Sequence, residues 1–116
     1  MAGQVPAMKW PLERPLLAPS LLSADPLRMW EGTASLEGQY DWLHLDIMDG
    51  HFVPNLSYGP SLLKSLRTAL PEAVLDVHLM VEPPENFIES FLRWRPDFLV
   101  VHQEATPHLH RVIQAI

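Results

Sequence analysis

Two short apolar segments carry the side chains best suited to metal or acid–base chemistry. Each segment spaces a histidine, an aspartate and a methionine at alternate positions. They are His44, Asp46 and Met48 in the first segment and Asp76, His78 and Met80 in the second. Alternate residues of a β-strand lie on the same face. If both segments are strands, four ionisable groups share one side of the sheet.

This polar face has two interpretations. A single buried histidine is most often a hydrogen-bonded core residue, and aspartates often cap loops. Four ionisable groups together are costly to bury unless they pair with one another or bind a metal ion. Imidazole and carboxylate ligands together suit zinc, iron, cobalt or manganese. The pattern alone leaves a metal or acid–base site and a hydrogen-bonded core as alternatives.

Three further polar residues end predicted strands. Ser20 follows Pro19, and its hydroxyl could bind a substrate hydroxyl or bond to the nearby backbone. His102 and Glu104 end the last predicted strand, where Glu104 could orient a histidine. Each of these signals is weaker than the paired pattern because it stands alone.

The elements that must position these residues alternate between two types. Short apolar runs bounded by turn residues predict buried strands. They cover residues 16–22, 42–48, 74–81 and 98–102. The segments between them have helical spacing of apolar residues. Four strand–helix units of this size predict an α/β protein with a parallel sheet and crossover helices.

Proline and N-cap residues predict where the helices begin. The predicted starts are Asp25-Pro26, Pro60, Pro84 and Thr106-Pro107. Pro96 is expected to end the third helix. The apolar stripe of the fourth helix is still running at Ile116, with no glycine or asparagine cap after it. We therefore expect the sequence to be a truncated fragment.

Composition narrows the class of protein. The 116 residues suffice for one compact domain, and 47% hydrophobic with 19% charged residues predicts a globular chain. The formal net charge of -6 argues against nucleic acid or an anionic membrane as partner. The absence of cysteine excludes disulfides and thiolate metal sites. With no signal-peptide pattern and no run long enough to span a bilayer, we expect a cytoplasmic protein.

Four motifs resemble those of the ribulose-phosphate 3-epimerase family. The most specific is residues 43–55 (LHLDIMDGHFVPN). The others are residues 18–25 (APSLLSAD), 76–81 (DVHLMV) and 102–105 (HQEA). The resemblance covers about residues 16–105. It implies a (β/α)8 TIM barrel, of which residues 16–116 would be the first four βα units after an irregular leader, residues 1–15.

The family inverts carbon 3 of D-ribulose 5-phosphate to give D-xylulose 5-phosphate. The resemblance implies that His44, Asp46 and His78 bind one divalent metal ion, which would be zinc, iron, cobalt or manganese. It implies that Asp46 is also the catalytic base. The substrate contacts that it implies are Ser20, His78, Met48 and Met80. The expected partners are a pentulose 5-phosphate and further copies of the chain in a homo-oligomer.

The sequence departs from the family pattern in two ways. The family's second acid, an aspartate on a later strand that is also a metal ligand, has no counterpart here, nor do its glycine-rich phosphate loops. Residues 94–97 (WRPD) stand where the family usually has Ala-Gly-Ala-Asp. We therefore expect the isolated chain to be inactive. A hexulose-6-phosphate 3-epimerase and a non-catalytic half-barrel assembly module are the alternatives.

Overall fold

A computed structural model describes residues 13–116 of the chain. Residues 1–12 lie outside the described part, so only the last three residues of the predicted leader can be compared. The described chain contains one parallel sheet in the order β1-β2-β3. Its strands are β1 (Trp42–Met48), β2 (Val74–Met80) and β3 (Phe98–Val100). The predicted α/β class with a parallel sheet is confirmed.

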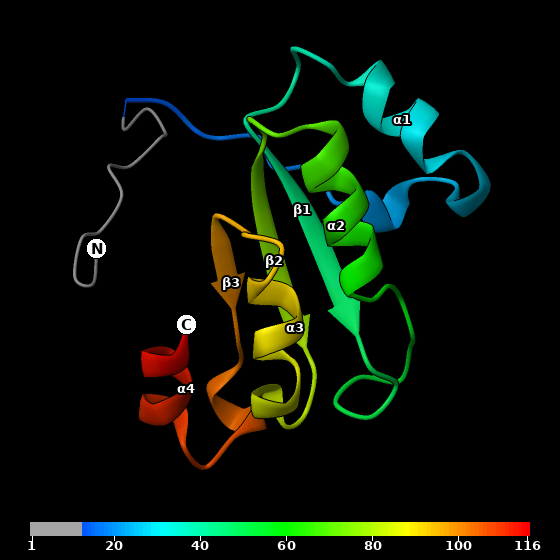
Figure 1. Ribbon diagram of the computed structural model, residues 1–116. Helices are drawn as coiled ribbons and strands as arrows, with labels where there is room; N and C mark the ends of the chain where they lie inside the picture. Colours follow the sequence, from blue (N-terminus) through cyan, green and yellow to red (C-terminus); the bar gives the residue numbers. More distant parts are fainter. Residues whose placement is uncertain (1–12) are drawn as a thin grey trace.

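Helices connect the strands, as a parallel arrangement requires. The α-helices are α1 (Met29–Ser35), α2 (Pro60–Ala69), α3 (Ile88–Leu92) and α4 (Leu109–Ala115). Short 3-10 helices cover Leu21–Ser23, Pro26–Arg28, Pro84–Asn86 and Gln103–Ala105. Figure 1 shows α2 and α3 on one face of the sheet. No helix in the described residues is long and apolar enough to cross a bilayer.

The hydrophobic core lies between the sheet and these two helices. Alternation buries the aliphatic residues of β1 and leaves the polar ones partly exposed on the other face. The core residues are Leu21, Leu43, Leu45, Ile47, Leu63, Leu66, Leu75, Val77, Leu79, Val81 and Phe91. Burial of each such side chain contributes about 1.5–3 kcal/mol of transfer free energy. This packing fixes which face of each strand carries the polar side chains.

The predicted first strand, residues 16–22, is wrong as a regular strand. It runs beside β1 but forms a single parallel bridge, Ser20 to His44, and then turns into a 3-10 helix. Pro19 accepts a hydrogen bond from His44 N at 3.0 Å through its carbonyl oxygen, but it has no N–H to donate in return. The ladder therefore stops after one bridge. The bridge still places Ser20 beside the polar face of β1.

The predicted helix starts are largely confirmed, with shorter helices than expected. Asp25 accepts a hydrogen bond from Leu27 N at 3.0 Å, as an N-cap does. The third helix begins as a 3-10 turn after Pro83 and ends at Leu92, four residues before the proline that was expected to end it. The chain leaves this helix through Arg95, which has a left-handed φ of 54°.

Arg95 occupies a conformation that favours glycine, and its position matches the glycine that the resembling family usually has there. A left-handed conformation costs an ordinary residue about 1–2 kcal/mol. Glycine avoids this cost, but it loses more backbone entropy on folding, which offsets part of the gain. We expect Arg95→Gly to raise the free energy of unfolding by about 0.5–1 kcal/mol. Urea unfolding at fixed protein concentration, followed by circular dichroism, measures the change.

Arg93→Gly is the matched control for this substitution. Arg93 lies at the end of α3 with φ of -50°, where glycine has no conformational advantage. We expect it to lower the free energy of unfolding by roughly 0.5–1 kcal/mol. Equal effects of the two substitutions would contradict the explanation from backbone conformation.

Candidate metal centre

The register of the sheet brings the polar residues of β1 and β2 into direct contact. The register pairs are His44 with Asp76, Asp46 with His78, and Met48 with Met80. Each histidine therefore stands beside an aspartate of the neighbouring strand. The pairs run from the middle of the two strands to their carboxyl ends, the end at which barrel enzymes place their sites. The predicted common face is confirmed.

His44 lies between two carboxylates. Its Nδ1 is 2.7 Å from Asp76 Oδ2, and its Nε2 is 3.0 Å from Asp46 Oδ1. Burial lowers the pKa of His44, but the hydrogen bond to Asp76 and the negative charges of both aspartates outweigh it and raise the pKa above its ordinary value. The ring is thus held at both nitrogens in a strongly negative environment.

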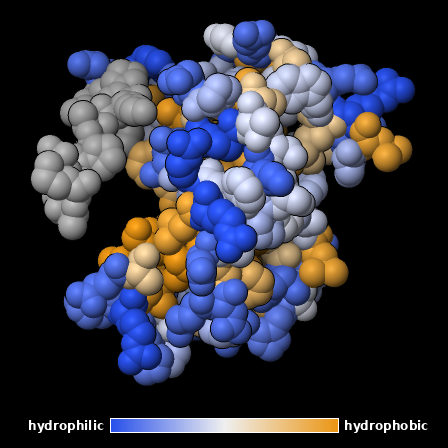
Figure 2. All heavy atoms as spheres, viewed as in Figure 1, coloured by the Kyte–Doolittle hydropathy of each residue, from blue (hydrophilic) through white to orange (hydrophobic). Residues whose placement is uncertain are grey.

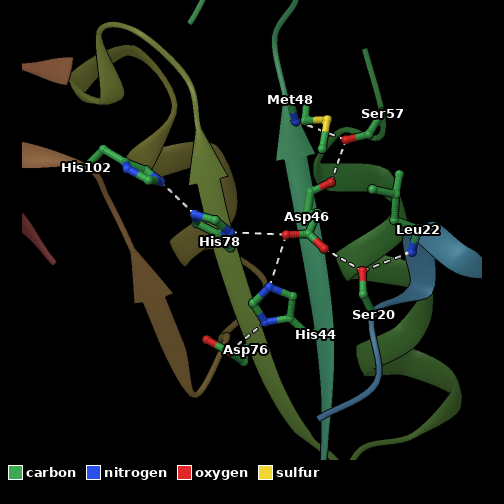
Figure 3. A network of polar contacts seen from close by, with 9 residues as sticks. All are labelled: Ser20, Leu22, His44, Asp46, Met48, Ser57, Asp76, His78 and His102. Carbon is green, nitrogen blue, oxygen red and sulfur yellow. Dashed lines mark hydrogen bonds and ion pairs between the residues drawn. The ribbon is translucent and has the colours of Figure 1, made fainter. Parts of the chain in front are cut away.

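Asp46 is the centre of the cluster. Its Oδ1 lies 3.0 Å from His44 Nε2 and 3.1 Å from His78 Nδ1, and its Oδ2 accepts a hydrogen bond from the Ser20 hydroxyl. Burial raises the pKa of Asp46, but the hydrogen bonds from Ser20 and His78 and the contacts with His44 outweigh it, so the pKa falls below its usual value. Asp46 is therefore ionised at neutral pH. Figure 3 shows these side chains converging from β1, β2 and the segment before Leu22.

A second chain of contacts continues from His78 on the side away from Asp46. His78 Nε2 lies 2.6 Å from His102 Nε2, and His102 Nδ1 lies 2.7 Å from Glu104 Oε1. The predicted role of Glu104 in orienting a histidine agrees with this contact. The ring of Phe52 packs against His102, with centroids 5.1 Å apart. His102 thus joins the site from the far end of β3.

The loop after β1 is organised by Asp49 and Gly50. Asp49 accepts backbone hydrogen bonds from His51 and Phe52 at 2.8 Å and from Glu82 at 2.9 Å. It therefore ties this loop to the end of β2. Gly50 has a φ of 74°, and a Cβ there would lie 3.2 Å from a Leu56 side-chain carbon. The turn that carries Phe52 toward His102 therefore needs glycine at this position.

The proton count of the cluster tests whether a metal ion fits. His44 lies between two carboxylate oxygens and would need an N–H on both nitrogens. His78 and His102 face one another through Nε2, and the Nδ1 of each ring faces a carboxylate, that of Asp46 or Glu104. Hydrogen bonds at all three places need three N–H groups, but two neutral imidazole rings carry only two. If the two protons on His44 Nε2 and His78 Nδ1, the nitrogens that face Asp46, are removed, the histidine rings are neutral and every other hydrogen bond of the cluster is kept.

The two protons between the histidines and Asp46 have the same total charge as one divalent cation, so such a cation could replace them. The ligand atoms of His44, Asp46 and His78 all lie within 4.8 Å of one another. Two imidazole nitrogens and a carboxylate oxygen are a donor set that suits zinc and other divalent transition metals. The cluster could therefore hold a divalent metal ion in place of the two protons. The ion itself is treated as a proposal below.

The structure places the predicted site residues in two groups. Ser20, His44, Asp46 and His78 are in direct contact. Met48 and Met80 are register partners at the carboxyl ends of their strands, on the same face. Two contacts were not predicted: the bond of Asp76 to His44, and that of His102 to His78. In the sequence, Asp76 could be recognised by its place on the polar face of its strand. His102 could be recognised only by its place at the end of a predicted strand.

The comparisons with known proteins agree with this arrangement. Residues 16–116 match the profile of the ribulose-phosphate 3 epimerase family. Proteins named ribulose-phosphate 3-epimerase are similar to the chain: it is 48% identical to that of Bacillus subtilis (strain 168) and 52% to that of Treponema pallidum (strain Nichols), each over 103 residues. A relative from Rhodobacter capsulatus is 45% identical over 101 residues.

The matched regions cover a large fraction of this chain but a smaller fraction of each relative. They cover 86% of this chain but 44% to 46% of the three relatives, so the chain spans less than half of their length. The family match covers more than half of the chain and includes every residue of the cluster. The chain belongs to the ribulose-phosphate 3-epimerase family.

Proposed function

We propose that this chain supplies the metal-binding and base-carrying half of an enzyme that inverts carbon 3 of D-ribulose 5-phosphate to give D-xylulose 5-phosphate. The observation that carries the proposal is the convergence of one ligand atom each from His44, Asp46 and His78 within 4.8 Å. The names of the relatives support the choice of substrate. A pentulose 5-phosphate partner and a cytoplasmic location are part of the proposal.

His44, Asp46 and His78 are the proposed ligands of one divalent ion. When bound, the ion supplies positive charge that stabilises the negative charge developing on the substrate oxygens. Asp76 holds His44 Nδ1 at 2.7 Å, which leaves Nε2 directed at Asp46. Carboxylate partners of this kind orient ligand histidines and raise their basicity.

Asp46 is the proposed base that removes the proton from carbon 3. Its lowered pKa keeps it ionised at neutral pH, so it can accept a proton. The Ser20 hydroxyl donates to its Oδ2, and a second hydroxyl, that of Ser57, donates to its backbone carbonyl oxygen. The first contact orients the carboxylate, and the second holds the backbone that carries it. Inversion also needs an acid on the opposite face of the substrate, which the other half of the enzyme would provide.

The remaining proposed contacts surround this base. Ser20 and His78 touch Asp46 from opposite sides, so a substrate at Asp46 would lie within reach of both. Met48 and Met80 end β1 and β2 on the same face. We propose that their apolar side chains line the site and limit access of water to the carbanion-like intermediate.

A hybrid barrel tests the function. Residues 16–116 would replace the matching N-terminal part of the Bacillus subtilis relative, which supplies the other half of the enzyme. We expect the hybrid, with added zinc, iron, cobalt or manganese, to convert ribulose 5-phosphate and to exchange its carbon 3 proton with deuterated water. The isolated 116-residue polypeptide is expected to do neither, because it spans less than half of the length of these relatives.

The Bacillus subtilis C-terminal part alone serves as the background control. Circular dichroism and cooperative unfolding would establish that the hybrid folds. A folded hybrid that exchanges no proton at carbon 3 with any of the four metals would refute the proposal. Conversion of a hexulose 6-phosphate in preference to ribulose 5-phosphate would refute the substrate assignment alone.

A further inference from the structure

The contacts of His102 and Glu104 have no part in the function proposed above, although they lie next to it. His102 Nε2 is 2.6 Å from His78 Nε2, and Glu104 Oε1 is 2.7 Å from His102 Nδ1. We propose that His102 and Glu104 are a positioning pair that fixes His78 in the tautomer whose Nδ1 lone pair faces Asp46. This inference rests on the proposed metal site, because that lone pair is a metal ligand there.

The direction of the effect follows from the hydrogen-bonding groups. The Glu104 carboxylate accepts only, so His102 must place an N–H at Nδ1. A neutral His102 then has a lone pair at Nε2, and this nitrogen accepts a hydrogen bond. His78 Nε2 must therefore carry the N–H of that bond. The Nδ1 of a neutral His78 is left with a lone pair, directed at Asp46 3.1 Å away.

The fold supplies this arm through β3 and the turn that follows it. His78 is the register partner of Val100, so His102, two residues later, lies on the same face of the sheet. The 3-10 helix Gln103–Ala105 then brings Glu104 back beside the ring. Ala105 is only 3% exposed and anchors the turn in the core.

Packing and charge keep the pair in place. The rings of His78 and His102 meet end to end through their Nε2 atoms, with centroids 4.9 Å apart and planes inclined by 28°, and Phe52 from the loop after β1 packs against His102. A backbone hydrogen bond, followed by the bond from His102, holds the pKa of Glu104 below its usual value. Glu104 is therefore ionised at neutral pH and can accept the hydrogen bond from His102 Nδ1.

The two ligand histidines are thus oriented by different devices. His44 meets its carboxylate, Asp76, directly from the neighbouring strand. His78 has no such neighbour at its Nε2 and reaches Glu104 through a second imidazole. The His102 arm adds the segment after β3 to a centre whose three proposed ligands come from β1 and β2.

The test uses zinc affinity and nitrogen NMR on the 116-residue chain. In the wild type we expect scalar coupling between His78 Nε2 and His102 Nε2 across one shared proton, with and without zinc, and a zinc-bound Nδ1. We expect His102→Leu to lower zinc affinity by about 10–100-fold. His102→Gln should recover most of the affinity, because its side-chain oxygen can accept from His78 Nε2.

Two further variants keep the result interpretable. Glu104 is 59% exposed at its side chain, so Glu104→Leu should fold even if His102→Leu does not; we expect it to lower zinc affinity by about 10-fold. His51→Leu is the matched control. His51 makes a peripheral 4.0 Å contact with Glu82, and its loss should leave zinc affinity unchanged.

The outcomes separate this inference from the proposed function. No nitrogen–nitrogen coupling in the wild type, or full zinc affinity in both Glu104→Leu and His102→Leu, would overturn the positioning pair. A wild-type chain that shows the coupling but binds no zinc would sink the proposed metal site, and it would leave the hydrogen-bonded pair standing.

Discussion

Asp46→Asn is expected to reduce turnover of the hybrid barrel by about three orders of magnitude or more. The carboxylate is the proposed proton acceptor, and general-base catalysis contributes about 10²- to 10⁴-fold. It is also the point where both ligand histidines converge, at 3.0 and 3.1 Å. The amide cannot accept the carbon 3 proton, and it weakens one of the three metal ligands proposed in this chain. One substitution therefore removes two contributions together.

Metal supply separates these two contributions. Turnover and zinc content would be measured for the wild-type and Asp46→Asn hybrids across a zinc titration. We expect activity to stay low when the variant is saturated with metal, because the base is still missing. Full recovery of turnover at high zinc would show that Asp46 is a ligand only, and our assignment of the base would be wrong.

Asp25→Asn is the matched control for this experiment. It makes the same carboxylate-to-amide change at the N-cap of Pro26–Arg28, where asparagine caps as well as aspartate. We expect turnover within about twofold of the wild type, since Asp25 makes no described contact with the cluster. A large loss in this variant would point to a general effect of removing a negative charge.

Much of the fold could be predicted because the chain alternates strongly. In β1 the aliphatic side chains of Leu43, Leu45 and Ile47 fall on the buried face, and the predicted bounds of this strand agree with the structure. The predicted third strand, residues 74–81, exceeds β2 by one residue. The segment before Leu21 was misread as a strand because apolar content alone does not show that Pro19 cannot continue the ladder.

The candidate site was predicted as a face, but its contacts were not. Alternation places His44, Asp46 and His78 on one side of the sheet in any register that buries the aliphatic faces of both strands together. Which residues touch depends on the register of the two strands, which alternation alone does not fix. The register pairs His44 with Asp76, and this pairing gives the 2.7 Å contact that orients the ring. A shift of two residues would keep the face and change every partner.

His102 illustrates a second limit. Its place at a strand end was visible in the sequence, and Glu104 was noted as a residue that could orient a histidine. Its contact with His78 depends on the register of β3 with β2 and on the 3-10 turn that follows. Neither is encoded in a short local pattern. Long-range contacts of this kind decide the chemistry of the site and need the three-dimensional structure.

The second large effect concerns association: we expect the 116-residue polypeptide to form at least a dimer. The sheet of the described chain has two edges, at β1 and β3. A single bridge from Ser20 covers part of the first edge. Unpaired strand edges present backbone N–H and C=O groups that pair readily with another chain. A closed eight-stranded barrel would have no such edges.

Exposed apolar side chains near β3 and α4 add to this tendency. Val100, Ile113 and Ile116 are 44%, 58% and 44% exposed. Figure 2 shows hydrophobic atoms gathered in this part of the molecule. A groove of about 400 Å³ between α3 and α4 is lined largely by apolar residues, among them Ile88 and Val112. Exposed apolar side chains beside an open strand edge favour association between copies of the chain.

Light scattering coupled to size exclusion measures the association. We expect a mass of at least twice the 13.2 kDa of one chain, falling toward one chain on dilution. Val100→Lys combined with Ile113→Glu should lower the mass, because charge at the β3 edge and on α4 opposes pairing. Leu27→Lys is the control. Leu27 is 94% exposed in the 3-10 helix Pro26–Arg28, and Figure 1 shows this segment next to α1 and away from β3 and α4. Its change should leave the mass unaltered.

The size of the effect follows from the small stability margin of such a chain. A complete domain of this length buries only about two-thirds of its unfolded surface. Its free energy of unfolding is then about 5–15 kcal/mol. Here the polar face of the sheet stays partly exposed, so the margin should be smaller and pairing between copies correspondingly favourable. A monodisperse 13.2 kDa monomer that unfolds cooperatively would show that three strands and the helices on one face are sufficient, and that the open edges do not drive association.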